Sequence, residues 1–134
     1  MNKKIKFISI LFAMSFIMTA AFAKPKNFEE VWAEKTEVSQ QYVDSLDELK
    51  ESFGGVIKDI KVYAEGKYLV YEYVYAVELD IETAKEALKN QFDSMKSTLK
   101  EVKKAVQKDF DYKKISIKYI YKTKDEEEIL VYEF

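Results

Sequence analysis

The 134-residue sequence contains no cysteine, histidine or arginine, and only one proline. Because a disulfide and a lipid-modified N-terminus both require cysteine, neither is expected, and packing alone must hold the fold. The absence of histidine excludes Ser-His and Cys-His nucleophile pairs and imidazole zinc ligands. The absence of arginine excludes bidentate clamps for phosphate or carboxylate groups. We therefore expect no catalytic residue, no cofactor and no metal ligand.

The net charge of the chain is small. All 22 basic residues are lysine, and the formal net charge of −2 becomes −5 when the first 23 residues are left out. A mildly acidic chain without arginine is unsuited to a phosphate backbone, so no nucleic-acid partner is expected. Aromatic residues make up 15% of the sequence, and their large apolar area helps a small domain to fold without disulfides.

The N-terminus has the pattern of a secretory signal peptide. Three lysines among the first six residues precede a mainly apolar run at 7–22, which ends in the small-x-small sequence Ala21-Phe22-Ala23. The run is shorter than the ~20 residues that span a bilayer, which disfavours the alternative of a permanent anchor. We predict a signal peptide at 1–23, cleaved after Ala23. The single domain at 24–134 is then periplasmic or secreted, with no stable membrane insertion after cleavage.

Two stretches have the pattern of amphipathic helices. Asn27 is a capping residue for a helix over 28–53, in which the weakly helical stretch 35–37 is a candidate break. Asp80 caps a second helix over 81–110, whose apolar residues recur about every 3.6 positions. At 1.5 Å per residue this helix would be ~45 Å long, which is longer than the strands. It must therefore overhang the sheet, bend or fray.

Four β-patterned runs occur in two pairs, at 56–64 and 67–77 and at 114–122 and 127–134. A short turn joins each pair, as in a hairpin. We predict an α+β domain with a four-stranded antiparallel sheet and two helices on one face, in the order αββαββ. The sequence Leu-Val-Tyr-Glu occurs at 69–72 and again at 130–133. This repeat marks either a duplicated αββ unit or shared strand patterning.

Alternation along the strands assigns side chains to two faces of the sheet. One face is expected to be covered by the helices, with tyrosine hydroxyls at its rim; it holds Leu69, Tyr71, Tyr73, Tyr75, Ile115, Ile117, Tyr119, Tyr121, Leu130, Tyr132 and Phe134. The opposite, open face carries aromatic and β-branched residues among lysines and glutamates. We predict an interaction face there, formed by Tyr63, Tyr68, Val70, Val74, Ile120 and Val131, and we place Ile129 on the same side. The alternative is an ordinary solvated sheet face with cross-strand ion pairs.

Acidic residues offer two candidate sites. The run at 125–128 lacks the spacing that wraps a loop around calcium, and it is interpreted as a solvated turn. Glu72 and Glu133, the acids of the repeated tetrapeptide, would form a carboxylate pair for hydrolysis if their strands were neighbours. Lys61 and Lys118 are expected on the same face, so ordinary ion pairing is the favoured interpretation.

A predicted signal and an N-terminal helix precede distinctive strand and turn sequences at 66–73, 79–80, 117–121 and 129–134. In these features the chain resembles a domain-of-unknown-function family of small exported bacterial proteins. The resemblance covers nearly all of the chain beyond the signal, and it implies no activity, ligand or catalytic residue. A weaker likeness to tandem helix-plus-hairpin inhibitor modules, such as the β-lactamase-inhibitor type, implies enzyme binding through an exposed sheet.

These observations favour a non-catalytic extracytoplasmic binding or interaction module with an unknown protein or glycan partner. The partner would meet the open sheet face or an exposed strand edge. A hydrolase using a carboxylate pair and a self-associating cell-envelope component are the alternatives.

Overall fold

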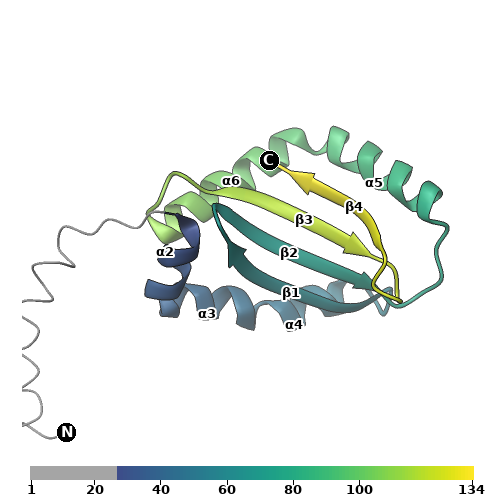
Figure 1. The fold of residues 1–134 in the computed structure, drawn as a ribbon, viewed down its shortest axis with the longest axis horizontal. Helices are drawn as coiled ribbons and strands as arrows, with labels where there is room; N and C mark the ends of the chain where they lie inside the picture. The colour runs from purple at the N-terminus through teal and green to yellow at the C-terminus, as the bar shows by residue number, and fades with distance from the viewer. Residues whose placement is uncertain (1–26) are drawn as a thin grey trace, which may run out of the picture.

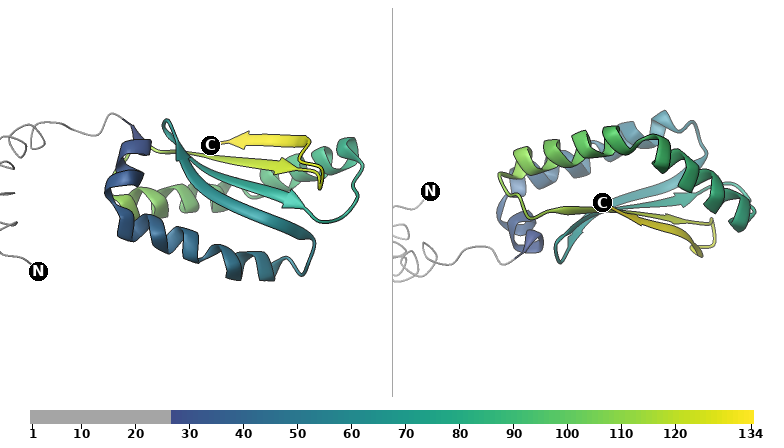
Figure 2. Two further views of the ribbon diagram at one scale, coloured as in Figure 1. Left: turned by 60° about the horizontal axis from the view of Figure 1, so that its bottom comes forward. Right: turned by 90° about the horizontal axis from the view of Figure 1, so that it is seen from above.

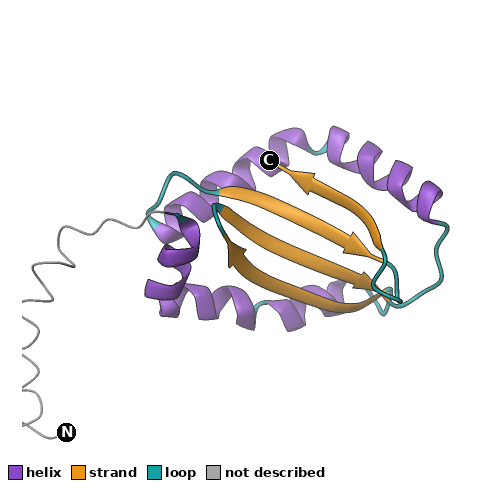
Figure 3. Cartoon of the chain, in the orientation of Figure 1, coloured by secondary structure: helices purple, strands orange, loops and turns teal. Residues whose placement is uncertain are grey.

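The computed structural model describes residues 27–134, so the predicted signal peptide and its cleavage point after Ala23 lie outside the described residues. Figure 1 and Figure 3 show helices and strands in two alternating groups. The elements are α2 (Phe28–Glu34), α3 (Thr36–Asp44), α4 (Leu46–Ser52), β1 (Ile57–Glu65), β2 (Tyr68–Tyr75), α5 (Ile81–Ser94), α6 (Lys96–Phe110), β3 (Ser116–Lys122) and β4 (Glu128–Glu133). The expected α+β class is confirmed, and each predicted helix is divided into shorter ones.

Both predicted capping residues begin a helix. Oδ1 of Asn27 accepts a hydrogen bond from the N–H of Glu30 at 3.2 Å, and Oδ2 of Asp80 accepts one from the N–H of Thr83 at 3.1 Å. Each carboxyl or amide oxygen satisfies an N–H that the first turn of a helix leaves without a partner. Local side-chain chemistry therefore decides where both helical segments start.

The helical segments bend without proline or glycine. At the break between α3 and α4, Oγ of Ser45 donates to the carbonyl of Tyr42 at 2.7 Å. Before the break between α5 and α6, Oγ of Ser94 donates to the carbonyl of Gln91 at 2.8 Å. Serine hydroxyls that bond a preceding carbonyl in this way often accompany a bend in a helix. The second predicted helix is interrupted at Met95, and Figure 2 shows α5 and α6 at an angle to each other.

The four strands form one sheet in the order β1-β2-β3-β4. The outer pairs β1–β2 and β3–β4 are antiparallel, whereas the central strands β2 and β3 are parallel. The prediction of a purely antiparallel sheet is therefore wrong, and the sheet is mixed. Helices α5 and α6 carry the chain back along the sheet, so that Ser116 at the start of β3 lies beside Tyr68 at the start of β2. Parallel neighbouring strands require a long crossover connection of this kind.

The repeated tetrapeptide does not mark a duplicated unit. Both copies place leucine and tyrosine toward the helices, at Leu69 and Tyr71 in β2 and at Leu130 and Tyr132 in β4. If β4 is superposed on β2 in the same direction and with the same face toward the helices, its hairpin partner β3 falls on the side opposite to β1. The two hairpins therefore have opposite hands relative to their helices. The hypothesis of a duplicated αββ unit is wrong, and shared strand patterning explains the repeat.

In the described part of the chain the helices lie against one face of the sheet (Figure 2). Leu69 and Ile117 are fully buried on this face, together with Phe28 of α2 and Phe110 of α6. The predicted assignment of the helix-covered face is therefore confirmed for these strands. It follows from strand alternation, which places every second side chain toward the core.

The sequence predicted that Ile129 lies on the open face, and this prediction is wrong. It is 3% exposed and packs with Leu88 and Phe92 of α5. The register of β3 and β4 shifts between Tyr121 and Lys122, opposite this part of β4. An irregularity of this kind re-aims a side chain, and simple alternation does not anticipate it.

Candidate binding groove

The helices form two arms that meet at one end of the sheet. Helices α3 and α4 run along β1, with α2 at the end of the sheet, whereas α5 runs along β4 and α6 continues from it toward α2 (Figure 1). At the shared end the rings of Phe28 and Phe110 meet edge to face, with centroids 4.9 Å apart. The hydroxyl of Tyr42 in α3 also donates a 2.6 Å hydrogen bond to Oδ2 of Asp109 in α6. Away from this junction the arms diverge, and the centre of the sheet lies between them.

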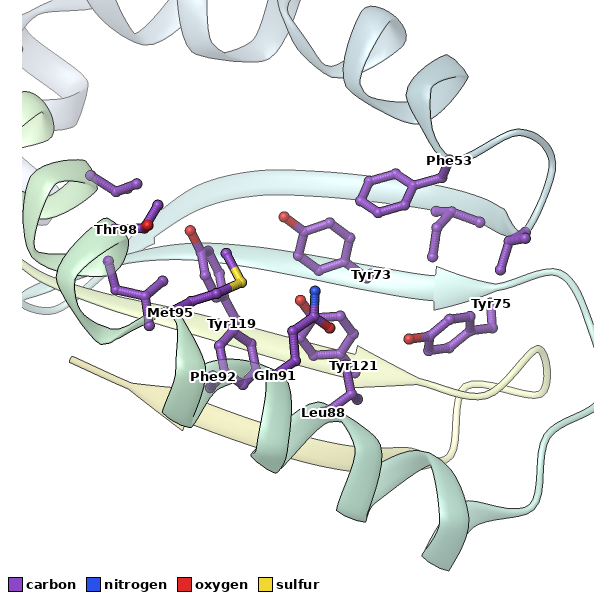
Figure 4. Close-up of a pocket in the computed structure, with 14 residues that line it drawn as sticks. Phe53, Tyr73, Tyr75, Leu88, Gln91, Phe92, Met95, Thr98, Tyr119 and Tyr121 are labelled. Atoms are coloured by element: carbon purple, nitrogen blue, oxygen red, sulfur yellow. The ribbon is translucent and has the colours of Figure 1, made fainter.

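A cavity of about 390 Å³ lies in the space between the diverging arms. Its floor consists of Tyr73 and Tyr75 from β2 and Tyr119 and Tyr121 from β3. In Figure 4, Gln91 and Met95 reach over these rings from one side, and Phe53 faces them from the other. The further lining residues are Val56, Ile57, Leu88, Phe92, Thr98, Leu99 and Val102. We call this cavity the tyrosine groove.

The parallel pairing of β2 and β3 creates the aromatic floor. Tyr73 is in register with Tyr121, and Tyr71 with Tyr119. The rings of Tyr73 and Tyr121 are stacked, with centroids 4.8 Å apart and planes 9° from parallel. Because stacked and edge-to-face ring contacts stabilise one another, the floor is largely organised before any ligand arrives.

The hydroxyl groups of the floor are available to a ligand. Within residues 27–134, the hydroxyls of four tyrosines have no hydrogen-bond partner: Tyr73, Tyr75, Tyr119 and Tyr121. In the same part of the chain, every polar side-chain atom that is shielded from solvent has a hydrogen-bond partner. The four tyrosine hydroxyls therefore keep some contact with solvent, and all four residues line the groove. Burial raises the pKa of each of the four, because the charged phenolate is disfavoured away from water. The floor consequently remains neutral and able to donate hydrogen bonds.

Among the residues that the structure describes, no charged side chain lines the tyrosine groove. Its polar groups are the tyrosine hydroxyls, the amide of Gln91 and the hydroxyl of Thr98, whereas Phe53 and Val56 at the rim remain 39% and 43% exposed. Since nothing in the groove would neutralise an ion, burying a charged ligand there would be unfavourable. The groove is suited to a neutral molecule with both apolar surface and hydrogen-bonding groups. Within residues 27–134, no group of three or more acidic side chains is placed to hold a metal ion.

The predicted interaction face lies on the other side of the sheet, and two of its members are buried. Val70 is 0% and Val74 is 4% exposed, so neither offers much surface to a partner. The other four, Tyr63, Tyr68, Ile120 and Val131, are half-buried. The open face stays a predicted interaction surface, with its contact area confined to these four side chains.

Glu72 on the open face is bound by a lysine and a tyrosine. Oε1 of Glu72 lies 2.6 Å from Nζ of Lys122, and its other oxygen accepts a 3.0 Å hydrogen bond from the hydroxyl of Tyr63. Burial alone would raise the pKa of Glu72, but the bonds from Lys122 and Tyr63 and the charge of Lys61 outweigh it and lower the pKa. The same carboxylate helps burial to raise the pKa of Tyr63 to about 12.

Glu133 belongs to a separate contact on this face. The hydroxyl of Tyr68 donates to Glu133, and Nζ of Lys118 lies 4.2 Å from the centre of the Tyr68 ring. Strand β3 lies between the strands of Glu72 and Glu133. The two acids are thus on separate strands with different partners, and a joint role in hydrolysis stays a prediction without added structural support.

Reasoning from the sequence placed the groove tyrosines on the helix-covered face but did not identify a groove. The signal was present, because Tyr71, Tyr73, Tyr75, Tyr119 and Tyr121 are too many hydroxyl-bearing side chains for a closed apolar core. What the sequence did not show was that the two helical arms diverge and leave the middle of the sheet uncovered.

Comparison with known proteins gives one match. A family model described as Domain of unknown function (DUF4854) matches residues 29–134. The chain belongs to the DUF4854 family. This confirms the resemblance to a family of unknown function that the strand and turn sequences suggested. For this DUF4854 protein no match to a curated protein or to a solved structure was found. In its described part, none of the helices has the length and apolar character needed to span a bilayer.

Proposed function

We propose that this DUF4854 protein is an exported, non-catalytic binding module that holds a small uncharged molecule in the tyrosine groove. The observation that carries the proposal is the uncharged cavity of about 390 Å³, whose floor offers four tyrosine hydroxyls without a hydrogen-bond partner among residues 27–134. Its size lies within the range of ordinary small-molecule sites. Export rests on the pattern of residues 1–23.

The chemistry of the lining limits the ligand. Stacked tyrosine rings, Phe53 and Met95 favour an apolar body, while the hydroxyls and Gln91 favour a few hydrogen-bonding groups on it. A ligand that left these polar groups unpaired would lose affinity, because their contact with water is lost on binding. A ligand with a full charge would lose its hydration without gaining an ion pair.

The test compares three probes that share a phenyl ring and differ in charge: 2-phenylethanol, 2-phenylethylammonium and phenylacetate. NMR spectra of the protein with labelled tyrosine rings would report binding at Tyr73 and Tyr121. We expect the neutral probe to shift these ring signals at lower concentration than either ion. Equal binding of all three probes would contradict the proposal.

A variant that fills the groove provides a matched control. Thr98→Trp places a bulky ring in the groove from α6, and we expect it to abolish the shifts caused by 2-phenylethanol. Ser97→Trp adds the same ring at the neighbouring exposed position, which does not line the groove, and we expect it to leave them unchanged. Binding that survives Thr98→Trp would place the ligand elsewhere.

A further inference from the structure

A second cavity lies where α6 passes over β4. It has a volume of about 300 Å³ and is lined by Lys96, Leu99, Lys100 and Lys103 of α6, by Tyr132 of β4 and by Phe134. We call it the basic pocket. Leu99 also lines the tyrosine groove, so α6 separates the two cavities. Their chemistry differs, because the basic pocket combines an apolar floor with a cationic rim.

The three lysines of the rim lie on one side of α6. Lys96, Lys100 and Lys103 are four and three residues apart, which is the spacing of side chains that share a helix face. Within residues 27–134 none of the three takes part in an ion pair, whereas Lys104 on the same helix lies 3.7 Å from Glu101. Their charges are therefore available to an anion.

The floor of the basic pocket is aromatic, and a ring of α5 packs against it. The ring of Tyr132 is stacked on Phe92 of α5, with centroids 4.2 Å apart, and Phe134 lies 5.9 Å from Tyr132. These contacts leave one side of the floor facing α6 and its lysines. The long apolar stems of lysine extend this surface while their ammonium groups stay in water.

We propose that the basic pocket binds a single-chain anionic amphiphile, with its apolar chain on the aromatic floor and its anionic head among Lys96, Lys100 and Lys103. Charge complementarity carries the choice of ligand, because three lysines that form no ion pair within residues 27–134 gather here on a protein whose net charge is negative. The proposal goes beyond the tyrosine groove, which lacks charged groups.

Isothermal titration calorimetry with three ten-carbon probes tests the proposal. The three probes are decanoate, decyltrimethylammonium and decyl glucoside. Each would be titrated into the protein at concentrations below the critical micellar concentration of that probe. We expect one decanoate to bind per chain, with the cationic and neutral probes bound at least about ten-fold more weakly. Raising the salt concentration should weaken binding of decanoate and leave that of decyl glucoside unchanged, because salt screens exposed charges.

Lysine variants locate the anionic head. We expect Lys100→Gln to weaken decanoate binding about two- to five-fold, as for the loss of one exposed charge interaction. Replacing Lys96, Lys100 and Lys103 together should remove the preference for decanoate over decyl glucoside. Lys104→Gln is the matched control on the same helix and should change nothing. An equal effect of Lys104→Gln and Lys100→Gln would overturn the proposal.

NMR spectra and vesicle-binding measurements distinguish binding in the basic pocket from other modes of binding. Decanoate should shift the NMR signals of Tyr132 and Phe134. Its affinity for the Thr98→Trp variant should equal its affinity for the unaltered protein, because binding in the basic pocket does not depend on the tyrosine groove. Shifts centred on Tyr73 and Tyr121 instead would overturn the proposal. Binding to vesicles of anionic phospholipid without binding of monomeric decanoate would also overturn it, since it would indicate a membrane surface as the partner.

Discussion

The hydroxyl of Tyr42 in α3 lies 2.6 Å from Oδ2 of Asp109 in α6 and donates a hydrogen bond across 67 residues of sequence. Beside it, Phe28 and Phe110 pack edge to face. These contacts join the two helical arms at one end of the sheet, and the arms diverge from there (Figure 1). The width of the tyrosine groove therefore depends on a junction that lies outside the groove itself.

Removing the hydroxyl of Tyr42 should loosen this junction. We expect Tyr42→Phe to lower the free energy of unfolding by about 0.5–1.5 kcal/mol, the usual worth of one hydrogen bond, as measured by urea denaturation. Tyr112→Phe is the control, because Tyr112 packs against the same cluster and its hydroxyl has no partner within residues 27–134. Equal losses in both variants would show that the bond to Asp109 contributes nothing.

Phe110 should contribute more than any exposed aromatic residue. It is fully buried, so Phe110→Ala should cost about 3–5 kcal/mol of the free energy of unfolding through lost packing and a new cavity. Phe53→Ala, at a position that is 39% exposed, should cost well under half as much. Urea denaturation of both variants measures this difference, and comparable losses would contradict the assigned core.

Glu72 should make stability depend on pH in the acid range. Its pKa in the folded protein lies below the ordinary value of 4.5, so the unfolded chain takes up the proton first as the pH falls. Its contribution is fully present above about pH 4.5 and is lost as the pH falls through the lowered pKa.

Denaturation at several pH values tests this contribution. Glu72→Gln should flatten the fall of stability below about pH 4.5. Glu48→Gln, at an exposed residue of α4 without a hydrogen bond or ion pair in the described chain, should leave the fall unchanged. An unaltered pH profile for Glu72→Gln would mean that the bonds from Lys122 and Tyr63 do not favour the carboxylate.

Export should leave a defined N-terminus. When the full chain is produced in a bacterium with a secretion pathway, the protein outside the cytoplasm should have the mass of residues 24–134, measured by intact-mass spectrometry. Ala23→Phe should block processing, because the peptidase requires a small residue at this position. A chain that keeps residues 1–23 outside the cytoplasm would favour a permanent anchor over a cleaved signal.

Short-range features of the fold could be predicted from the sequence. Asn27 and Asp80 were identifiable as caps because the bond of each reaches only three residues along the chain. The side of the sheet on which Leu69 and Ile117 lie followed from strand alternation. In both cases the deciding contact or repeat is local, so the residue types alone are informative.

Pairings between distant segments could not be predicted in the same way. The parallel neighbours β2 and β3 are separated by the whole of α5 and α6, and strand patterning is the same for parallel and antiparallel partners. The shift that turns Ile129 inward depends on the register between β3 and β4. The sequence indicated the break near Lys35, but it did not indicate the breaks at Ser45 and Met95.

The amino-acid sequence by itself determined the number of strands, the residues at which the helical segments begin and end, and the placement of tyrosine side chains on the helix-covered face of the sheet. The tertiary structure alone decided that Tyr73 stacks on Tyr121 and that the arms meet at Phe28 and Phe110 and separate elsewhere. Capping and alternation act over a few residues, whereas a groove requires segments far apart in the chain to pack at one end and remain apart at the other.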